Sequence, residues 1–542
     1  MRNNAWLSSG GDEASDEVIT PRYVVEPIVK YLKAKNFKVV WCPFDTVVSQ
    51  YVRVLYKEGF DVRFGHRDIG LDFFKYECPE ADVIVSNPPF SCYSDDTEVF
   101  TKRGWIRFPN ILPTDEILSV NNKKEISWDK ISRVIKKEVN EDLYHFKNKN
   151  MDLLVTSDHR MFAYNKYSNE LCIGKDGDLL RASEIGSKHY FPKNGYTWKG
   201  EINNDYLVLP HTKNPPRSKV SFYPELKIPL IDWLPFFGLW LADGFVSTYK
   251  GTGHGYTVGI KQGESRWREV ENILNKLPFK YSKYINKIYP SDRERKADYA
   301  IYQKQLWDYM NQFGKSQNKF IPSWIKNLPV RYLKLLIYGY TLGDSFRHKG
   351  INSITTSIHY GSVSKQLLED IQEILLKLGN ITNISHQILN NGNDYYRLIL
   401  NKDSCSNRAM YIRKNPQNKE PYNGLVYCLT LKENSIFLVR RNNKIIFCGN
   451  CKDQVLERLY KLDKPFMVLF PVQALQGKKR TKLFMKYGLE YLGFDSRPCF
   501  YTKNDLSSIK TGNHFASGYY CRNVLPEKLI FEELKLIQEP FI

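Results

Sequence analysis

The sequence predicts a multidomain protein in which an all-β segment and an α/β segment are inserted into a split, doubly wound α/β domain. Helix and strand signals alternate in residues 1–91 and again in residues 451–542. The stretch between them changes to short alternating strands and then to long apolar helices. Alternating strands and helices are typical of a parallel sheet covered on both faces. A chain of 542 residues is also too long for one domain.

The two end pieces contain the signals of one shared sheet. TPRYVVEPIVKYL has apolar residues at helical spacing, KVVWCPF and FDVRF are short β-rich runs, and ADVIVSNPPF ends a buried strand at a turn. Near the other end, CKDQVLERLYKL is amphipathic and KPFMVLFPVQAL is typical of a central strand. We expect that strand to pair with the one ending at Ser86, because only a shared sheet buries both faces of such apolar strands.

The inserted stretch has three parts of its own. Short segments such as EILSVN and DLLVTSDH predict an all-β module over residues 92–215. Long apolar helices mixed with strands predict an α/β unit over residues 225–415, and short strands return over residues 421–450. The stretch HTKNPPRSKVSFYPELKIP, rich in proline and charge, predicts a linker before the α/β unit.

Composition limits the environment and the partners. No apolar run approaches the roughly 18–20 residues that span a bilayer, and the first residues lack the pattern of a signal peptide. The ten scattered cysteines form no paired metal-ligand spacing, so we expect a reduced protein in the cytoplasm. We also expect a monomer without membrane contact, in a prokaryotic or phage-infected cell. A formal charge of +20 favours double-stranded DNA or another nucleic acid as partner, although a lysine-rich surface alone would also produce it.

Sequence blocks at the two edges of the insert indicate what it is. CYSDDTEVFT opens it at Cys92, LLVTSDHRM lies inside it, and VYCLTL with IIFCGN closes it at Asn450, directly before Cys451. In this order, at the edges of a break in another domain, these blocks resemble those of an intein, a segment that excises itself. The resemblance implies an all-β, horseshoe-like splicing domain that needs no cofactor.

The chemistry implied by this resemblance explains the residue types. The Cys92 thiol attacks the preceding carbonyl to form a thioester, because sulfur is the side-chain nucleophile best suited near neutral pH. His159 protonates the departing amide nitrogen, and Thr156 holds the developing oxyanion together with backbone N–H groups. Cys451 then takes over the upstream segment, and Asn450 cyclises and cuts the chain. Every step is intramolecular, which supplies much of the rate.

Two positions depart from the usual intein pattern. Gly449 stands where many inteins have a histidine; it gives Asn450 backbone freedom but cannot act as an acid. Cys428 stands where an aspartate is frequent. It could tune the thiol or thioester chemistry, relay the acyl group as a third sulfur, or be a small buried strand residue. We expect Cys448 to be structural.

The α/β unit contains a duplicated signal. LPFFGLWLADGF pairs Gly238 with Asp243, and LLIYGYTLGDSF pairs Gly339 with Asp344. The two stretches resemble the paired helices of a LAGLIDADG (DOD-type) homing endonuclease. The resemblance implies two pseudo-symmetric halves, with Asp243 and Asp344 as catalytic residues that bind Mg²⁺ against scissile phosphates. It also implies that GYTVGIKQG and DYYRLILNK form strands of a basic DNA-binding surface.

One lysine completes the endonuclease resemblance. Lys319, in NKFIPSWI, matches the lysine that precedes the second helix in this family. The resemblance implies that it polarises the attacking water or the phosphate. The alternative is an ordinary surface lysine.

The split domain resembles a class I S-adenosylmethionine-dependent methyltransferase acting on amino groups, through the motif NPPF. The resemblance implies that Asn87 and the Pro88 carbonyl accept hydrogen bonds from a target NH₂, that Phe90 stacks on a flipped base of a nucleic acid, and that Asp72 binds the cofactor. However, KVVWCPFDTVVSQYV has no glycine where a glycine-rich loop should follow the first strand. The alternative is a non-catalytic, methyltransferase-like nucleic-acid-binding domain.

Overall fold

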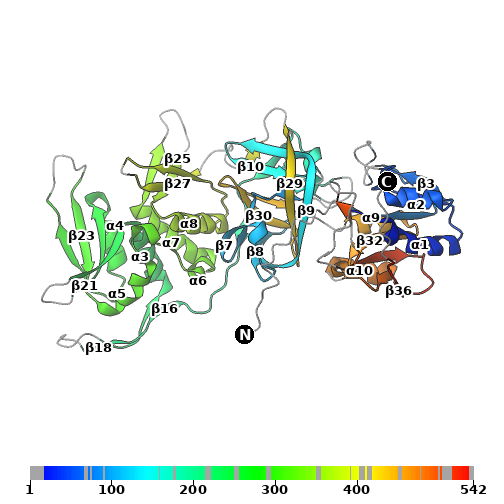
Figure 1. Ribbon diagram of the computed structural model, residues 1–542. Helices are drawn as coiled ribbons and strands as arrows, with labels where there is room; N and C mark the ends of the chain where they lie inside the picture. Colours follow the sequence, from blue (N-terminus) through cyan, green and yellow to red (C-terminus); the bar gives the residue numbers. More distant parts are fainter. Residues whose placement is uncertain are drawn as a thin grey trace.

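The computed structural model contains three lobes in a row (Figure 1). It describes residues 18–65, 71, 73, 76–88, 92–157, 159–174, 179–213, 221–249, 255–287, 294–349, 356–390, 392–401, 409–411, 418–449, 454–475, 478–498, 501–502 and 516–535. We name the lobes after their content. The terminal lobe holds residues 18–88 and 454–535, the β lobe residues 92–198 with 409–449, and the paired-helix lobe residues 206–401. No helix among these residues is long and apolar enough to span a membrane.

The terminal lobe is one sheet made from both end pieces of the chain. Its seven strands lie in the order β3-β2-β4-β32-β35-β33-β36. They are β2 (Val39–Cys42), β3 (Asp61–Phe64), β4 (Val83–Ser86), β32 (Phe466–Pro471), β33 (Glu490–Phe494), β35 (Ser517–Arg522) and β36 (Leu529–Glu532). The predicted pairing is present: β32 runs parallel to β4, with Phe466 opposite Ile84. Its helices are α1 (Arg22–Ala34), α2 (Gln50–Lys57), α9 (Gln454–Leu462) and α10 (Lys478–Tyr487), and β1 (Val18–Ile19) pairs with β34 (Tyr501–Thr502) outside the sheet.

The β lobe consists almost entirely of strands. Its large sheet contains β5 (Tyr93–Ser94), β6 (Glu98–Thr101), β7 (Gly104–Arg107), β8 (Glu116–Val120), β9 (Glu125–Asn148), β10 (Met151–Val155), β15 (Thr197–Trp198), β29 (Asn418–Leu431), β30 (Ile436–Arg441) and β31 (Lys444–Gly449). The long strands β9 and β29 pair along their length, so the beginning and the end of the insert share one sheet. Smaller sheets contain β11 (Arg160–Met161), β12 (Tyr164–Asn165), β13 (Leu180–Arg181), β14 (His189–Pro192) and β28 (Ala409–Tyr411). Because β28 pairs with β14, residues 409–411 lie with the β lobe, although the sequence suggested the α/β unit.

The paired-helix lobe is built from two similar halves. Each half has one long helix, α3 (Leu230–Asp243) or α7 (Val330–Gly343), followed by a four-stranded antiparallel sheet. The first sheet has the order β20-β21-β23-β22 and the second the equivalent order β24-β25-β27-β26. These strands are β20 (Gly244–Tyr249), β21 (Gly255–Gly263), β22 (Ser282–Ile285), β23 (Lys296–Ile301), β24 (Ser345–Lys349), β25 (Thr356–Ser362), β26 (Ile384–Ile388) and β27 (Asp394–Asn401), and the other helices are α4 (Trp267–Leu274), α5 (Lys304–Met310), α6 (Ser323–Lys326) and α8 (Lys365–Lys377).

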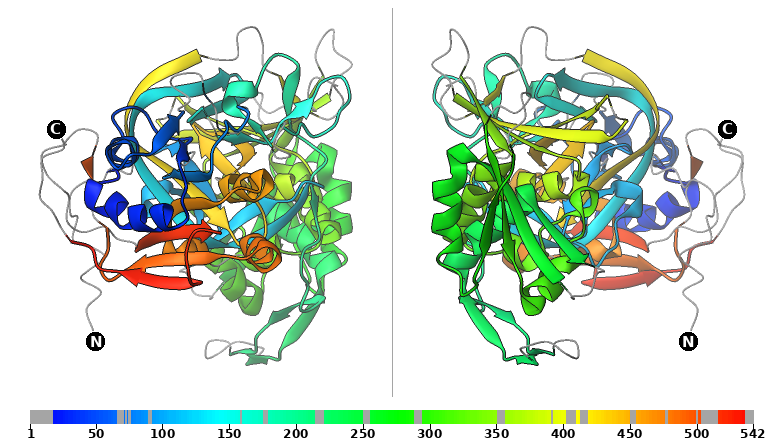
Figure 2. Two further views of the ribbon diagram at one scale, coloured as in Figure 1. Left: turned by 90° about the vertical axis from the view of Figure 1, so that its right-hand side faces the viewer. Right: turned by 90° about the vertical axis from the view of Figure 1, so that its left-hand side faces the viewer.

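The stretch expected to be a linker forms a two-stranded arm instead. β16 (Tyr206–Leu209) pairs with β19 (Leu226–Pro229), and β17 (Thr212–Lys213) pairs with β18 (Phe222–Tyr223). The arm projects from the paired-helix lobe (Figure 2). Gln305 anchors its base by donating from Nε2 to the carbonyls of Pro210 and Pro224, at 2.8 Å each.

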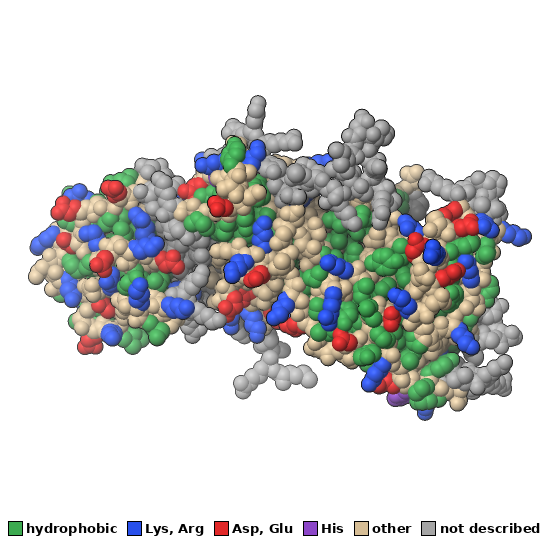
Figure 3. Space-filling view, turned by 180° about the vertical axis from the view of Figure 1, so that it is seen from behind, with side chains coloured by type: hydrophobic (Ala, Val, Ile, Leu, Met, Phe, Trp, Pro, Cys, Tyr) green, Lys and Arg blue, Asp and Glu red, His purple; other side chains and the backbone are tan. Residues whose placement is uncertain are grey.

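Polar contacts join the β lobe to the paired-helix lobe. The Arg440 guanidinium bonds to Glu98 of its own lobe and to Glu369 of α8. The Trp198 indole donates to the Leu328 carbonyl at 3.1 Å. Basic and acidic side chains are scattered over all three lobes on the face in Figure 3, so the positive charge does not form one block there.

Candidate functional sites

Cys92 lies at the entrance of β5 and is completely buried. Its backbone N–H donates to the Thr156 hydroxyl at 2.9 Å, and the Thr156 N–H donates to the Cys92 carbonyl at 3.0 Å. That nitrogen belongs to the Ser91–Cys92 peptide bond. The Thr156 hydroxyl therefore lies at the nitrogen of this bond. The oxyanion role expected for Thr156 stays a prediction, because Ser91 lies outside the described residues.

Tyr93 connects the two ends of the insert. Its hydroxyl donates to the Gly449 carbonyl at 2.5 Å, across a sequence separation of 356 residues. Its ring lies edge-on to the buried His159 imidazole, with centroids 4.0 Å apart. His159 also follows Thr156 in a turn, where its N–H donates to the Thr156 carbonyl at 3.1 Å. Three predicted blocks thus meet around one tyrosine that the sequence reasoning did not select.

Gly449 is explained by a close approach of two backbones. A Cβ atom at this position would lie 2.6 Å from the Arg160 Cβ and 2.7 Å from the Arg160 carbonyl oxygen. No side chain fits there without a shift, so a histidine is excluded from this backbone. The neighbouring Cys448 is fully buried, with Sγ 3.3 Å from the Arg160 carbonyl, and burial raises its thiol pKa to about 12. Such a thiol stays protonated, which agrees with a structural role.

Cys428 shares a hydrophobic cluster with Cys92 and Cys448. It is fully buried in β29, directly after Tyr427, which pairs with Tyr93. If the antiparallel register of β29 and β5 continues by one residue, Cys428 lies opposite Cys92. That position suits a tuning or relay role and equally a small core residue, so all three alternatives stay open. Asn450 and Cys451 lie outside the described residues.

The two long helices of the paired-helix lobe touch through glycines. A Cβ at Gly238 would lie 2.1 Å from the Leu336 carbonyl oxygen, and one at Gly339 would lie 2.0 Å from the Pro235 carbonyl oxygen. Only glycine permits this contact between backbones. The crossing brings the ends of α3 and α7 together, and Asp243 and Asp344 stand at these ends.

The two aspartates form an electrostatically coupled pair. Burial raises the pKa of Asp344 to about 7, with a further increase from the Asp243 charge. Burial also raises the pKa of Asp243, partly offset by a hydrogen bond from the Gln262 side-chain amide of β21. Gln262 was not selected from the sequence, although it lies in the predicted strand GYTVGIKQG. Its inward position in β21 is the signal that could have identified it.

Lys319 is not a surface residue, since only 4% of it is exposed. Its ammonium group donates to the carbonyls of Trp240, Leu241 and Gly244 at 2.9, 3.0 and 2.8 Å. These bonds use all three lysine donors and hold the end of α3, which bears Asp243. Burial lowers the Lys319 pKa to about 8, and the charges of Asp344 and Asp243 oppose that decrease.

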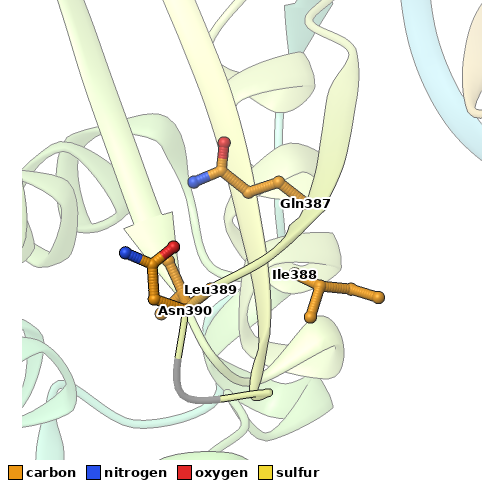
Figure 4. Close-up of a pocket in the computed structure, with 4 residues that line it drawn as sticks. All are labelled: Gln387, Ile388, Leu389 and Asn390. Atoms are coloured by element: carbon orange, nitrogen blue, oxygen red, sulfur yellow. The ribbon is translucent and has the colours of Figure 1, made fainter.

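The aspartate pair fits a divalent cation. Burial raises the pKa of both carboxylates, and positive charge beside them would favour their ionised forms. Mg²⁺ commonly binds one or two protein carboxylates together with substrate phosphates. Among the described residues, no group of three or more His, Cys, Asp or Glu could hold a metal ion alone. A divalent cation at Asp243 and Asp344 would therefore need further oxygen ligands from a substrate. A separate hollow at the end of β26 is lined by Gln387, Ile388, Leu389 and Asn390, none of which titrates (Figure 4).

The terminal lobe has a buried polar cluster where β2 and β4 end. Asp45 follows β2, is 8% exposed, and accepts hydrogen bonds from the hydroxyls of Ser49, at 2.5 Å, and of Ser86. Burial raises its pKa to about 6. The half-buried Asn87 donates to the Thr20 hydroxyl at 3.4 Å, and Pro88 is buried. Asp72 and Phe90 lie outside the described residues.

Comparison with known proteins gives one family match. Residues 332–412 match the model of the LAGLIDADG-like domain, which supports a LAGLIDADG endonuclease in this chain. That segment begins inside α7 and includes Asp344 and the second sheet.

Several curated proteins match the chain at low identity, among them the following three. An ATP-dependent Clp protease proteolytic subunit from Chlamydomonas moewusii is 25% identical over 70% of this chain and 38% of its own length. A section of an RNA polymerase β subunit from Stigeoclonium helveticum is 25% identical over 68% of this chain and 37% of its own length. A ribonucleotide reductase β subunit from Aquifex aeolicus is 22% identical over 66% of this chain and 50% of its own length. The match thus spans half or less of each relative.

Solved structures match parts of the chain. The homing endonuclease I-DmoI, in complex with DNA and Mn, has 19% identity and a TM-score of 0.23, covering 31% of this chain and 89% of its own. The homing endonuclease I-WcaI, bound to its DNA recognition sequence, has 13% identity and a TM-score of 0.24, covering 32% of this chain and 76% of its own. The AceL NrdHF split intein has 24% identity and a TM-score of 0.17, covering 20% of this chain and 65% of its own. These TM-scores are too low to establish a shared fold.

Proposed function

We propose that the protein is a precursor from which residues 92–450 excise themselves and join residues 1–91 to residues 451–542. The observation that carries this proposal is the contact between the two ends of the insert, through the Tyr93 hydroxyl and the Gly449 carbonyl. A segment that removes itself must bring both of its boundaries to one place. Likeness to three proteins with unrelated names agrees with an element carried by unrelated hosts.

The proposed reaction begins at Cys92. Its sulfur bonds to the Ser91 carbonyl carbon, the bond from that carbon to the Cys92 nitrogen breaks, and His159 supplies the proton that the nitrogen takes up. The hydrogen bond between this nitrogen and Thr156 fixes the leaving group in place. The Cys451 sulfur then displaces the Cys92 sulfur from the thioester, which gives a branched chain.

Asn450 resolves the branch. Its side-chain nitrogen bonds to its own backbone carbonyl carbon, the bond to the Cys451 nitrogen breaks, and one amide proton passes to that nitrogen. The joined host then changes from thioester to peptide bond through a five-membered ring. All steps need only residues of the chain, so no cofactor enters.

We infer a second activity, Mg²⁺-dependent cleavage of double-stranded DNA by the paired-helix lobe. The meeting of Asp243 and Asp344 at glycine-packed helix ends supports it, together with the family match over residues 332–412. When bound, Mg²⁺ would neutralise charge on the scissile phosphates. Gln262 orients Asp243, and Lys319 holds the helix end from which Asp243 projects.

The DNA target follows from the insertion point. An element that spreads by cutting insert-free copies of its host gene must recognise the sequence encoding NPPFS followed by CKDQ. A supercoiled plasmid carrying that uninterrupted sequence, incubated with the excised insert and Mg²⁺, tests the activity. Linear product is expected from this plasmid, and equal cutting of a plasmid without the sequence would contradict the assignment.

For the joined host, the observations favour a methyltransferase-like nucleic-acid-binding domain over an active amino-methyltransferase. The sheet carries Asn87 and Pro88 at the carboxyl end of β4, where ligands of such sheets bind. However, Asp45 is buried and bonded by two hydroxyls where a glycine-rich loop would offer N–H groups. The loop after β2 therefore does not fit S-adenosylmethionine in the manner of such a loop.

Calorimetry on the joined host separates these two alternatives. No heat of binding at millimolar S-adenosylmethionine, from a product with the circular dichroism of a folded α/β domain, is the expected result. Saturable binding that is lost in an Asp72→Ala host would instead restore the methyltransferase, with Asn87 as the residue that holds the target amino group.

A further inference from the structure

The Tyr93 side chain donates a hydrogen bond to the carbonyl directly before Asn450. It is fully buried, and its position is fixed from several sides. Its ring stacks on Phe108 with centroids 5.4 Å apart, packs against Phe437 at 5.6 Å, and meets the His159 ring edge-on. A side chain held in this way presents its hydroxyl group at one place.

The bond from Tyr93 matters because of what position 449 lacks. A histidine beside the cyclising asparagine would supply a hydrogen-bonding group, but the Arg160 backbone lies too close for any side chain there. The peptide unit between Gly449 and Asn450 must therefore be held by another residue. The Tyr93 hydroxyl contacts that unit at its carbonyl oxygen.

We propose that Tyr93 is a positioning residue for the cyclisation of Asn450, in place of a side chain at position 449. This inference rests on the proposed splicing function. The bond fixes the rotation of the peptide unit that precedes Asn450 and so limits the angles at which the side-chain amide meets the backbone carbonyl carbon. Because Tyr93 directly follows Cys92, the same residue ties the first cleavage point to the last one.

The position of Tyr93 predicts an effect on one step and not on another. Thioester formation at Cys92 uses Thr156 and His159, whose backbone contacts do not involve the tyrosine hydroxyl. Asn450 cyclisation takes place at the Asn450–Cys451 bond, directly after the peptide unit that the hydroxyl holds. Loss of the hydroxyl should therefore slow the second step selectively.

The test is Tyr93→Phe in the full chain, which removes one oxygen and keeps the ring. Tyr427→Phe is the matched control, because Tyr427 is also buried, pairs with Tyr93 and stacks on Phe108. In Tyr93→Phe we expect the branched intermediate to accumulate and cyclisation to slow about tenfold, the usual scale for a lost buried hydrogen bond. Thiol-induced cleavage at Cys92 should keep the unsubstituted rate, and the control should splice normally.

Several outcomes overturn the inference. Unchanged cyclisation in Tyr93→Phe would do so, as would equal slowing of thiol-induced cleavage, or an equal effect in Tyr427→Phe. If Tyr93→Phe fails to fold, 3-fluorotyrosine at position 93 replaces it. Because its hydroxyl is more acidic and donates a stronger hydrogen bond, Asn450 in this variant should cyclise at least as fast as in the unsubstituted chain. Slower cyclisation in a folded protein would contradict the inference. An unsubstituted chain that never splices would instead refute the proposed function itself.

Discussion

In the β lobe, the residues proposed to react come from the two ends of the insert, whereas in the paired-helix lobe they come from two copies of one unit. Strand β5 pairs with β29, and the hydroxyl of Tyr93 at the start of β5 bonds to the carbonyl of Gly449 at the end of β31. Helices α3 and α7 instead cross at Gly238 and Gly339 and bring Asp243 to Asp344. The described residues of the first centre, Cys92, Tyr93, Thr156 and His159, are buried, while the second centre brings two carboxyl groups together.

This difference indicates that the two centres are independent although their lobes touch. Joining the ends suits a reaction on the chain itself, which needs no entrance for a substrate. Duplication suits a substrate with two strands, because each half supplies one carboxylate.

The largest effect is expected when both ends of the splicing reaction are removed. Cys92→Ala with Asn450→Ala eliminates the attacking thiol and the cyclising amide, so the 542-residue chain should stay intact. DNA cleavage by this intact chain should continue, since Asp243 and Asp344 are unchanged. Gel electrophoresis and the plasmid assay measure both properties. A joined host released by this double variant would show that the boundaries are wrong.

The reverse change should affect only the paired-helix lobe. Asp243→Ala removes one of the two carboxylates and should lower DNA cleavage by at least about 100-fold. Splicing should stay within about twofold of the unsubstituted rate, because the β lobe holds its own reactive residues. Asp232→Ala, at the other end of α3, is the matched control and should leave both activities in place. Continued cutting by Asp243→Ala would refute the assignment.

A smaller effect is expected at position 449. Gly449→His introduces the residue that is usual in inteins, yet its Cβ would lie 2.6 Å from that of Arg160. Overpacking of this kind typically costs ~1–3 kcal/mol, so Asn450 cyclisation should slow. Accumulation of the branched intermediate, measured by denaturing gel electrophoresis, is the expected result. Faster cyclisation would show that the close approach to Arg160 does not exclude a histidine.

The smallest expected effect concerns pH and stability. Asp344 has a pKa of about 7 in the folded protein and about 4 when unfolded, so between these values the folded state binds more protons. Stability without metal should therefore fall as pH rises from about 4 to 7. Mg²⁺ should raise the melting temperature by a few degrees more at pH 8 than at pH 6. In a domain of this size, ~1 kcal/mol of stability corresponds to roughly 2–4 °C in melting temperature. In Asp344→Asn this difference should disappear.

Sequence reasoning predicted the fold well because periodicity and duplication are local signals. The helix over TPRYVVEPIVKYL, the strands GYTVGIKQG and DYYRLILNK, and the pairing of β32 with β4 are all present. The arm was missed because proline and charge suggested a linker, while the pairing of β16 with β19 depends on partners distant in sequence.

The direction of individual side chains could not be predicted in the same way. A lysine in a polar stretch does not reveal that its ammonium group turns inward to three carbonyls of α3. The contact of the Thr156 hydroxyl with the Cys92 nitrogen could not be predicted either, because it depends on how β10 and β5 meet. From the sequence, Gly449 lacked the acid that a histidine would supply at this position. Only the close approach of the Arg160 backbone explains why a glycine stands there.

Mass spectrometry of the freshly synthesised, unsubstituted chain can show directly whether residues 92–450 excise themselves. We expect the full-length mass to decline while two masses rise together, those of residues 92–450 and of residues 1–91 joined to 451–542. Peptide sequencing across the new junction should read NPPFS followed directly by CKDQ. A folded chain that stays at full length, or that breaks at Cys92 without forming the joined product, would contradict the account.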